Sequence, residues 1–377
     1  MIGALIMVMV AWLEGEHRSQ RRFGPGVCGP ADPSYIRAST ETGGQPFFLS
    51  SAEVAKSAQI MSASSQSDLM LWASGDSEKT YSVSVDSSVE RASFSASFDS
   101  RGGTLTVISP EGTIFQQGER SQDTLLNCGR VITIDAPAIG AWHVRVAPTG
   151  RFWLVARSKS DLSLIAAEFV QPGGRPGHEG LVRIQGQPIA GKPATLRVRV
   201  SSEVKSATVG LVSLDAEPLQ NLELKSLENG EFVWALSLPH EAFRVTVTGL
   251  DESGSRFQRI FATLFHAERV EVIPPTGVET VAAGSVSPII FMVRNSGPSI
   301  RLNLVAVDSK GSVIAVEPST LELDQGAEGA VTVRLTVPAD TAPDSRLGIT
   351  LTAFTEGASP TGNSATKEFT VITSRYN

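Results

Sequence analysis

The sequence predicts a mainly β fold in which tandem immunoglobulin-like β-sandwiches follow a short α/β segment. From about residue 69 onward, apolar and polar residues alternate in short runs, which is the period of a half-buried strand. Glycine (34) and proline (21) punctuate these runs, and aromatic residues make up only 6% of the chain. At 377 residues, a usual domain size of about 150 residues predicts two or three domains.

Stretches rich in serine, glycine or proline divide the chain into four parts. These stretches are Ser62–Ser67, Gln171–Gly177 and the pair Pro274-Pro275. We therefore expect an α/β segment and then three β-sandwiches, at residues 1–62, 63–170, 171–273 and 274–377. Each sandwich would be near the size of an immunoglobulin-like domain, although none carries the Cys…Trp…Cys pattern of antibody domains.

The stretch from Asn127 to Arg157 gives the clearest local prediction. Arg130–Asp135 alternates apolar and polar residues, and Pro137 ends this strand because proline cannot donate a ladder hydrogen bond. Gly140 allows a sharp turn into the next strand, which begins near Trp142. We expect Trp142 to fill the core, since a buried aromatic of that size removes about 150–250 Å² from water. The alternative is a tryptophan on the surface.

Before the sandwiches, the sequence predicts two helices. Asp32 followed by Pro33 indicates the start of a helix over Ser34–Thr42, and Gln45–Leu49 is a short strand. Ser50 and Glu53 form a capping box for a second helix, whose buried face we expect to contain Val54, Ala58 and Met61. The first apolar run, Ile2–Leu13, is too short to span a bilayer and lacks the features of a secretion signal, so a buried strand fits it equally well.

Period-two runs identify the strands of the three sandwiches. In the first sandwich they are Leu69–Ala73, Lys79–Val85, Ala92–Phe98, Thr104–Ile108, Thr113–Gln116, Arg130–Ile134, Trp142–Val146, Phe152–Ala156 and Leu164–Val170. In the second they are Thr195–Val200, Lys205–Leu211, Leu219–Leu224, Glu231–Leu236, Phe243–Leu250 and Gln258–Ala267. In the third they are Ser287–Arg294, Arg301–Asp308, Val316–Leu323, Ala330–Val337, Arg346–Phe354 and Thr366–Ile372.

The charge of the chain restricts the kinds of partner that it can bind. The net charge of −7 and a pI near 5.4 argue against nucleic acid or an anionic membrane as the main partner, since either would need clustered lysine and arginine.

Cys28 and Cys128 are the two cysteines. They either remain separate thiols or form a disulfide, which would close a loop of about 100 residues and stabilise the fold by about 4–5 kcal/mol.

We find no motif for catalysis, a metal or a cofactor. The five histidines, His17, His143, His178, His240 and His266, have no ligand spacing, and His143 should face outward because it alternates with Trp142. No nucleotide-binding loop, nucleophile elbow or zinc-protease motif occurs. Carboxylates near predicted turns are expected to be solvated rather than to bind calcium: Asp99, Glu111, Asp123, Asp251 and Glu252. The sequence therefore predicts a protein that is not an enzyme and has no cofactor.

Several segments carry a family resemblance. Cys28-Gly29 and the run Ile36–Leu49 (IRASTETGGQPFFL) resemble the closing segment of a von Willebrand factor A domain of the hemicentin type. Val85–Val89 (VDSSV) and Val107–Gly112 (VISPEG) resemble the strand and turn that follow in hemicentin-like proteins. Further matches in the same order lie at Leu125–Asn127, Pro137–Trp142 and Gly150-Arg151. The resemblance implies that residues 1–62 are a truncated A domain and that residues 63–170 are a hemicentin-like β-sandwich.

One departure from that family concerns the metal site. An A domain binds a divalent cation through an Asp-x-Ser-x-Ser loop, with a further Thr and Asp from later loops. That motif does not occur here, and the nearest segment, Asp86–Glu90, has glutamate at its fifth position. We therefore expect a chain that begins inside the A domain and lacks its metal-dependent adhesion site.

Two hypotheses of function follow, beside a third possibility that residues 1–62 are unfolded in isolation and the chain is not a functional product. The first is a non-enzymatic adhesion or matrix protein, outside the cell or on its surface, whose sandwiches space and present surfaces to protein partners. The second is an accessory stalk of a larger secreted enzyme or surface protein.

Overall fold

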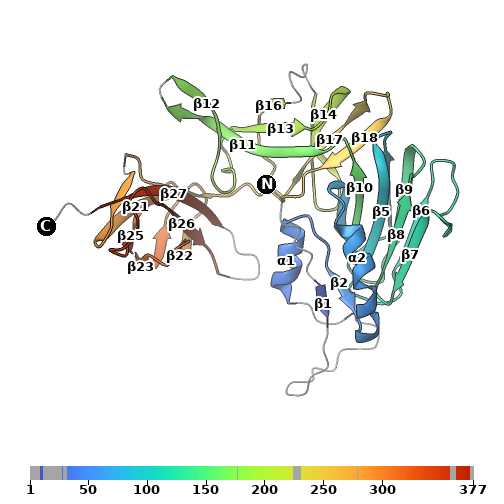
Figure 1. Ribbon diagram of the computed structural model, residues 1–377, viewed down its shortest axis with the longest axis horizontal. Coiled ribbons are helices and arrows are strands. Elements are labelled where there is room, and N and C mark those ends of the chain that lie inside the picture. The colour runs from blue at the N-terminus through green and yellow to red at the C-terminus, as the bar shows by residue number, and fades with distance from the viewer. Residues whose placement is uncertain are drawn as a thin grey trace. The chain divides into compact units, whose positions relative to one another are not determined.

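The computed structural model describes residues 9–11, 28, 32–175, 177–223, 231–277, 279–356 and 362–373 (Figure 1). The fold is mainly β, with several antiparallel sheets, immunoglobulin-like modules and two short α-helices. The chain divides into two compact units. The first contains Met1–Glu168, Leu196–Trp234 and Glu241–Phe265, and the second contains Phe169–Thr195, Ala235–His240 and His266–Asn377.

The α/β segment consists of β1 (Met9–Ala11), α1 (Pro33–Glu41), β2 (Phe47–Leu49), the 3-10 helix η1 (Ser51–Lys56) and α2 (Ser57–Ser64). β1 pairs with β2 in parallel. Asp32 caps α1 by accepting a hydrogen bond of 2.8 Å from the backbone N–H of Ser34. The predicted first helix and the strand after it are therefore present, shifted by one or two residues.

The predicted face of the second helix is wrong. The capping box of Ser50 and Glu53 is present, but it opens a 3-10 helix that becomes α-helical only at Ser57. A 3-10 helix has three residues per turn, so the apolar stripe rotates relative to an uninterrupted α-helix. Ile60 and Ala63 are buried, whereas Val54 and Met61 are exposed. Ser62–Ser64, which we expected in a linker, form the last turn of α2.

The first β module is a sandwich of two sheets. Its strands are β3 (Asp68–Gly75), β4 (Lys79–Val85), β5 (Val89–Phe98), β6 (Thr104–Ile108), β7 (Ser121–Leu126), β8 (Gly129–Asp135), β9 (Gly140–Ala147) and β10 (Phe152–Ser160). One sheet has the order β3-β10-β5-β8-β7 and the other β4-β9-β6. Thr113–Gln116 forms only an isolated bridge, Ile108 with Ile114, because turns flank it closely. The sequence did not predict β7, since Ser121–Thr124 is polar throughout.

The larger sheet of this module is covered on both faces. Ala92–Phe98 of β5 and Phe152–Ser158 of β10 are buried without interruption, although serine alternates with apolar residues in Ala92–Phe98. One face packs against β4, β6 and β9, and the other packs under the α/β segment through residues such as Phe48 and Ile60. Figure 1 shows α1, α2 and β2 on one side of this sheet and β6 and β9 on the other.

The second β module contributes β11 (Leu164–Arg175), β12 (His178–Arg183), β13 (Ala194–Val200), β14 (Val204–Val212), β15 (Pro218–Glu223), β16 (Glu231–Leu236), β17 (Arg244–Asp251) and β18 (Arg256–Ile260). One of its sheets has the order β12-β11-β13-β16. The other, β15-β14-β17-β18, continues into the first module through the pairing of β18 with β3 at Ile260 and Leu69. A nine-stranded sheet therefore runs through both modules.

The linker predicted at Gln171–Gly177 is wrong. Residues 171–175 continue β11 and pair with β12, with Gln171 opposite Val182 and Gly173 opposite Gly180. Glycine and proline weaken a strand but do not prevent pairing when a partner strand is adjacent. Here the partner is His178–Arg183 (HEGLVR), in which no apolar alternation marks a strand.

The third β module is a complete immunoglobulin-like sandwich. Its strands are β19 (Val270–Ile273), β20 (Thr280–Ala282), β21 (Val286–Asn295), β22 (Ile300–Asp308), β23 (Val313–Glu317), β24 (Thr320–Leu323), β25 (Glu328–Thr336), β26 (Arg346–Phe354) and β27 (Gly362–Ile372). The sheets β19-β21-β25-β23 and β20-β27-β26-β22-β24 enclose one apolar core. β19 pairs with β21, so this sandwich begins before the expected boundary at residue 274.

Candidate interaction site

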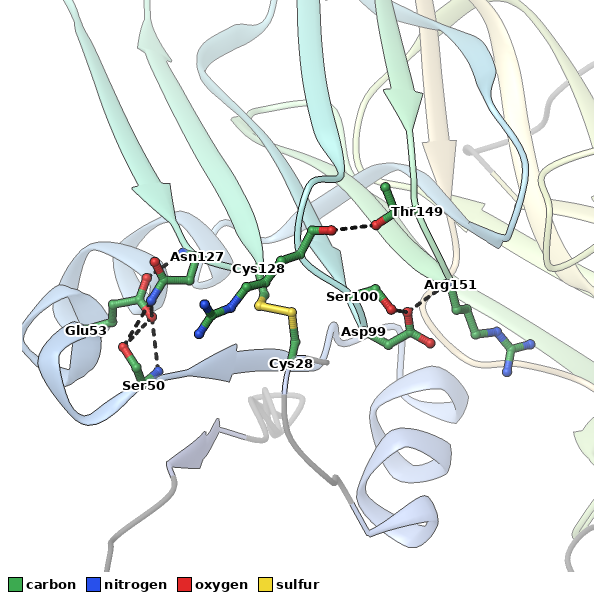
Figure 2. Close-up of a disulfide and its surroundings, with 10 residues drawn as sticks. Cys28, Ser50, Glu53, Asp99, Ser100, Asn127, Cys128, Thr149 and Arg151 are labelled. Carbon is green, nitrogen blue, oxygen red and sulfur yellow. Dashed lines mark hydrogen bonds between the residues drawn. A yellow bond between two sulfur atoms is a disulfide. The ribbon is translucent and has the colours of Figure 1, made fainter. Parts of the chain in front are cut away.

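The two cysteines form a disulfide that attaches the α/β segment to the first module. Cys28 and Cys128 lie 6.0 Å apart between Cα atoms and are both buried. The bridge joins the chain before α1 to the turn between β7 and β8 (Figure 2). Of the two alternatives left open by the sequence, the structure contains the disulfide.

Beside this bridge, Glu53 joins the 3-10 helix η1 to the same turn. Its carboxylate accepts hydrogen bonds from the backbone N–H of Asn127 (2.6 Å) and from the Asn127 side chain (3.0 Å). The same carboxylate closes the capping box with Ser50 (Figure 2). Burial by itself raises the pKa of Glu53, but the hydrogen bonds from Ser50 and Asn127 outweigh it and lower the pKa. An ionised carboxylate thus fixes the helix against the β7–β8 turn.

Trp142 lies in the core of the first module. It is 5% exposed, stacks on Phe94 with ring centroids 5.6 Å apart, and donates an indole hydrogen bond of 2.9 Å to the carbonyl of Ala138. Pro137 is buried in the turn before β9. Gly140 has φ of 139°, and a Cβ there would lie 2.9 Å from Pro110, so the turn requires glycine.

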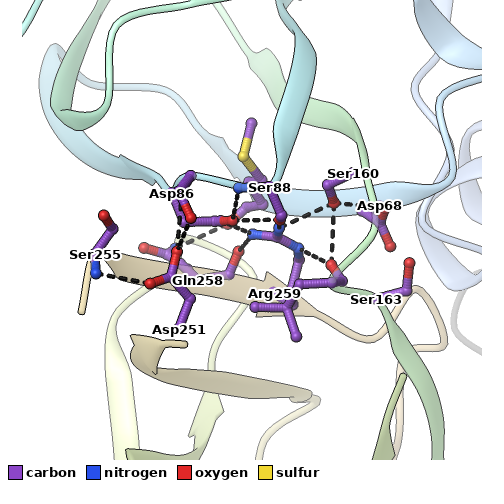
Figure 3. A network of polar contacts seen from close by, with 12 residues as sticks. Asp68, Asp86, Ser88, Ser160, Ser163, Asp251, Ser255, Gln258 and Arg259 are labelled. Atoms are coloured by element: carbon purple, nitrogen blue, oxygen red, sulfur yellow. Dashed lines mark hydrogen bonds and ion pairs between the residues drawn. The ribbon is translucent and has the colours of Figure 1, made fainter. Parts of the chain in front are cut away.

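The VDSSV segment forms the turn between β4 and β5, and a buried ion pair holds it. The Arg259 guanidinium of β18 lies 2.8 Å from the Asp86 carboxylate, and both residues are 1% exposed. Arg259 also donates to the carbonyl of Leu162 (2.8 Å) and to the hydroxyl of Ser160 (2.9 Å). Figure 3 shows Arg259 between Asp86 and Ser88 on one side and Ser160 on the other. Asp86 and Ser88, the closest match to a metal-binding motif, therefore participate in an internal contact.

Asp251 holds the same turn from the other module. Its carboxylate accepts hydrogen bonds from the backbone N–H (3.1 Å) and hydroxyl (2.6 Å) of Ser87, and from Ser253 and Ser255 in its own turn (2.7 Å each). Burial alone raises the pKa of Asp251, and these hydrogen bonds together lower it to about 2. We expected Asp251 to be solvated, but it is 5% exposed.

The other carboxylates that we expected to be solvated differ in their surroundings. Glu111 and Glu252 are exposed. Asp99 accepts a hydrogen bond of 2.8 Å from the backbone N–H of Arg151, and Asp123 pairs with Arg130 at 2.6 Å. In both cases the carboxylate holds a turn or an edge strand in place, which the spacing of acidic residues along the chain does not reveal.

Two buried arginines contact the carboxyl-terminal end of α1. Arg157 of β10 donates a hydrogen bond of 2.6 Å to the carbonyl of Gly43, and Arg244 of β17 donates to the carbonyls of Thr40 and Ala262. The Arg244 guanidinium also lies 4.5 Å from the centre of the Trp72 ring. Burial lowers the pKa of Arg157 to about 10 and, together with the charge of Arg157, that of Arg244 to about 9. Both remain cationic at neutral pH.

A groove of about 340 Å³ lies between the first and second β modules of the same compact unit. One wall is the β4 segment Lys79–Ser82. The other wall comes from β14, β17, β18 and the turn before β15, and includes Gly210, Val212, Glu217, Pro218, Thr246, Thr248, Gln258 and Ile260. A second cavity, of about 660 Å³, lies in the other compact unit and is lined by residues of β11, β12 and β19 and by the segment from Ile184 to Thr195.

Among the described residues, no three His, Cys, Asp or Glu side chains gather in a way that could hold a metal ion. His143 and His240 are exposed. His17 lies outside the described residues, as does the side chain of His178. Within the described part of the chain, no helix is long and apolar enough to cross a membrane.

Sequence reasoning missed the buried arginines and Tyr81 in the groove wall. The sequence does carry a signal for the arginines, because strand residues two positions apart lie on the same face. Arg259 shares its strand face with Phe257, and Arg157 shares its face with Trp153 and Val155, all of which are buried. A cation at an inward position of an apolar strand must find acceptors nearby. The sequence does not say which acceptors, because these lie up to about 200 residues away.

Comparison with known proteins finds an immunoglobulin-like match for the third β module and a distant similarity to hemicentin-1 over part of the chain. Residues 272–373, which contain the third β module, match the model of the VWA7 Ig-like domain family. Mouse hemicentin-1 is 22% identical over 245 residues, which is 61% of this chain. The chain spans only 4% of the length of hemicentin-1.

Several solved structures were also matched. The titin fragment I67–I69 is 10% identical, with a TM-score of 0.18, over 79% of this chain and 93% of the titin chain. Salmonella alpha-2-macroglobulin is 13% identical, with a TM-score of 0.27, over 79% of this chain and 30% of the macroglobulin.

Proposed function

We propose that this chain is a non-enzymatic adhesion or matrix protein of the hemicentin type, which holds surfaces for protein partners at fixed positions. The observation that carries the proposal is the nine-stranded sheet that joins the first two β modules. The Asp86–Arg259 ion pair and the Ser87–Asp251 hydrogen bonds fix the same junction. Flexibly linked domains would not need buried charges at their boundary. A rigid pair of modules suits a spacer.

The disulfide supports a place outside the cell. Bridges of this kind persist in oxidising compartments and are rare in the cytosol. The Cys28–Cys128 bridge spans 100 residues and is buried, so it belongs to the folded core of the unit. The partial similarity to hemicentin-1 points in the same direction.

The α/β segment fits the closing part of a von Willebrand factor A domain that now serves the neighbouring sandwich. The parallel pairing of β1 with β2, with α1 between them in the chain, supports this origin. The metal-binding motif of such domains is not in the sequence, and the nearest segment supplies Asp86 and Ser88 to the contact with Arg259. Adhesion by this chain would then be independent of divalent cations.

The test is an adhesion assay with the full chain. Beads coated with the protein are applied to surfaces of purified collagen, laminin or fibronectin and to cultured cells, and the retained fraction is measured against coating density. We expect saturable retention on at least one surface, unchanged by EDTA. Beads coated with an unrelated immunoglobulin-like protein serve as the control. Retention no greater than that control, or complete loss in EDTA, contradicts the proposal, and so does a catalytic activity that a point substitution abolishes.

A further inference from the structure

The groove between the first two β modules has an edge strand as one wall. Among the described strands, β4 pairs with β9 alone in the sheet β4-β9-β6, and on its other side it approaches β18 of the second module without pairing with it. Four consecutive residues, Lys79, Thr80, Tyr81 and Ser82, line the groove. Successive side chains of a strand point to opposite faces, so a run of consecutive lining residues means that the edge of the strand borders the groove. Unpaired main-chain groups on such an edge can pair with an added strand.

The opposite wall offers mixed chemistry. Val212 and Ile260 provide apolar surface, and Thr246, Thr248 and Gln258 provide polar groups. A site that is largely apolar with a few polar groups is typical for binding, and about 340 Å³ falls within the usual range. Four residues of an extended strand span about 13 Å. The groove therefore suits a short extended segment.

A buried phenol at the groove has no partner within the described part of the structure. Tyr81 is 6% exposed and lines the groove, and its hydroxyl makes no hydrogen bond to any described residue. Burial raises the pKa of Tyr81, with smaller contributions from the charges of Asp215 and Glu217. The hydroxyl is thus neutral and can either donate or accept one hydrogen bond. The oxygen itself is enclosed by protein atoms, so a ligand in the groove meets the edge of β4 and not this hydroxyl.

The charge at one end of the groove is unbalanced. Lys79 contacts two carboxylates, Asp215 at 3.8 Å and Glu217 in a direct ion pair. A hydrogen bond from Ser213 lowers the pKa of Asp215, which keeps that carboxylate ionised. With one ammonium and two carboxylates, this end carries more negative than positive charge, so a further positive charge would balance it. The side chains of Asp215 and Glu217 are about half exposed, so a ligand can reach them.

We propose that this groove binds an extended peptide segment of a protein partner, which adds to the free edge of β4 and places a lysine or arginine beside Asp215 and Glu217. The proposal rests on the proposed function and names a binding surface for it. Main-chain hydrogen bonds to β4 provide affinity, and the apolar wall and the carboxylates select the side chains.

The first experiment measures peptide binding to the full chain. The probe is acetyl-Lys-Val-Thr-Val-Thr amide with a fluorophore, followed by fluorescence anisotropy. A peptide with Glu in place of Lys should bind at least about tenfold more weakly, and one with alternate N-methylated amides should not bind at concentrations up to about 1 mM. Hydrogen exchange should slow at the amides of Lys79–Ser82 when the probe binds. Failure of the probe to bind, or equal binding of the three peptides, overturns the proposal.

The second experiment places a bulky residue in the groove. Thr248 is exposed and lines the groove, whereas Thr104 is exposed on β6, the opposite edge of the same small sheet. Thr248→Trp should weaken probe binding at least about tenfold, and Thr104→Trp should leave it unchanged within about twofold. Glu217→Gln should weaken binding of the Lys peptide but not that of the Glu peptide, because it removes one of the carboxylates that attract Lys and repel Glu. Equal effects of the two tryptophan substitutions contradict the proposal.

The bead assay separates this inference from the proposed function. If Thr248→Trp abolishes probe binding and bead retention, both stand. If retention persists without probe binding, the adhesive role stands and the groove is not the adhesive surface, which overturns the inference.

Discussion

Replacing Arg259 by methionine should destabilise the first compact unit severely. The guanidinium is 1% exposed and donates to Asp86, Leu162 and Ser160, so methionine removes all of these hydrogen bonds while roughly keeping the volume. Asp86 is also 1% exposed, and among the described residues Ser88 would be its remaining side-chain and backbone donor. Breaking a buried ion pair by removing one partner costs about 3–5 kcal/mol, because the remaining charge is uncompensated. We expect the loss in free energy of unfolding caused by Arg259→Met to lie in that range.

The double variant tests the cause. Asp86→Asn with Arg259→Met removes both charges, and the carbonyl of the introduced side-chain amide could still accept the hydrogen bond from the Ser88 backbone. Replacing both charges of a buried pair is often close to neutral. The double variant should therefore be more stable than Arg259→Met alone, with a coupling free energy of about 2–3 kcal/mol.

Urea unfolding followed by tryptophan fluorescence measures these changes. Trp72, Trp142, Trp153 and Trp234 all belong to the first compact unit, so the signal reports its unfolding. Arg91→Met is the matched control, since Arg91 pairs with Asp135 at a site where both side chains are about half exposed. It should change the free energy of unfolding by less than about 1 kcal/mol. An effect of Arg259→Met below about 1 kcal/mol, or additive effects in the double variant, would refute the reasoning.

Three further predictions concern the same unit. Trp142→Ala should cost about 3–5 kcal/mol in urea unfolding, as deletion of a core aromatic does, and a cost below about 1 kcal/mol would mean that the stacking contributes little. Reduction of the Cys28–Cys128 bridge should lower the free energy of unfolding by about 4–5 kcal/mol, and unchanged unfolding after mass spectrometry shows two thiols would contradict this. Asp251 has a folded pKa of about 2, below its unfolded value, so its contribution is present above about pH 4 and is lost as the pH falls through 2. Asp251→Asn should thus cost about 2 kcal/mol at pH 7 and have a smaller effect near pH 2, whereas an equal cost at both pH values would exclude the titration of Asp251 as the cause.

Local signals in the sequence predict much of the fold. The strands Lys79–Val85 and Thr104–Ile108 have the bounds that alternation predicts, because one face of each packs on the core and the other meets solvent. Asp32 caps its helix because its carboxylate, two residues before the Ser34 N–H, needs no distant partner. The immunoglobulin-like third module follows from the same period-two pattern.

Features that depend on distant partners were not predictable in this way. The hairpin of β11 and β12 forms in a segment whose glycines and prolines indicate a linker, and the partner strand β12 lacks a period-two pattern. Which face of α2 is buried depends on the 3-10 helix η1 that precedes it. The junction of the first two modules depends on Asp86 and Arg259, which are 173 residues apart, and no local pattern pairs them.

The buried arginines indicate that the α/β segment, although short, has a structural role. Burying a guanidinium is costly unless its donors find acceptors. Arg157 comes from the first module and Arg244 from the second, and both donate to carbonyls at or just beyond the end of α1. The carboxyl-terminal end of a helix carries partial negative charge, so it is a favourable place for cations. If the segment were removed, both cations would lose these acceptors and Trp72 would lose its hydrogen bond to Gly44. The segment is therefore part of the junction between the two modules, and a chain without it would have to rebuild that junction.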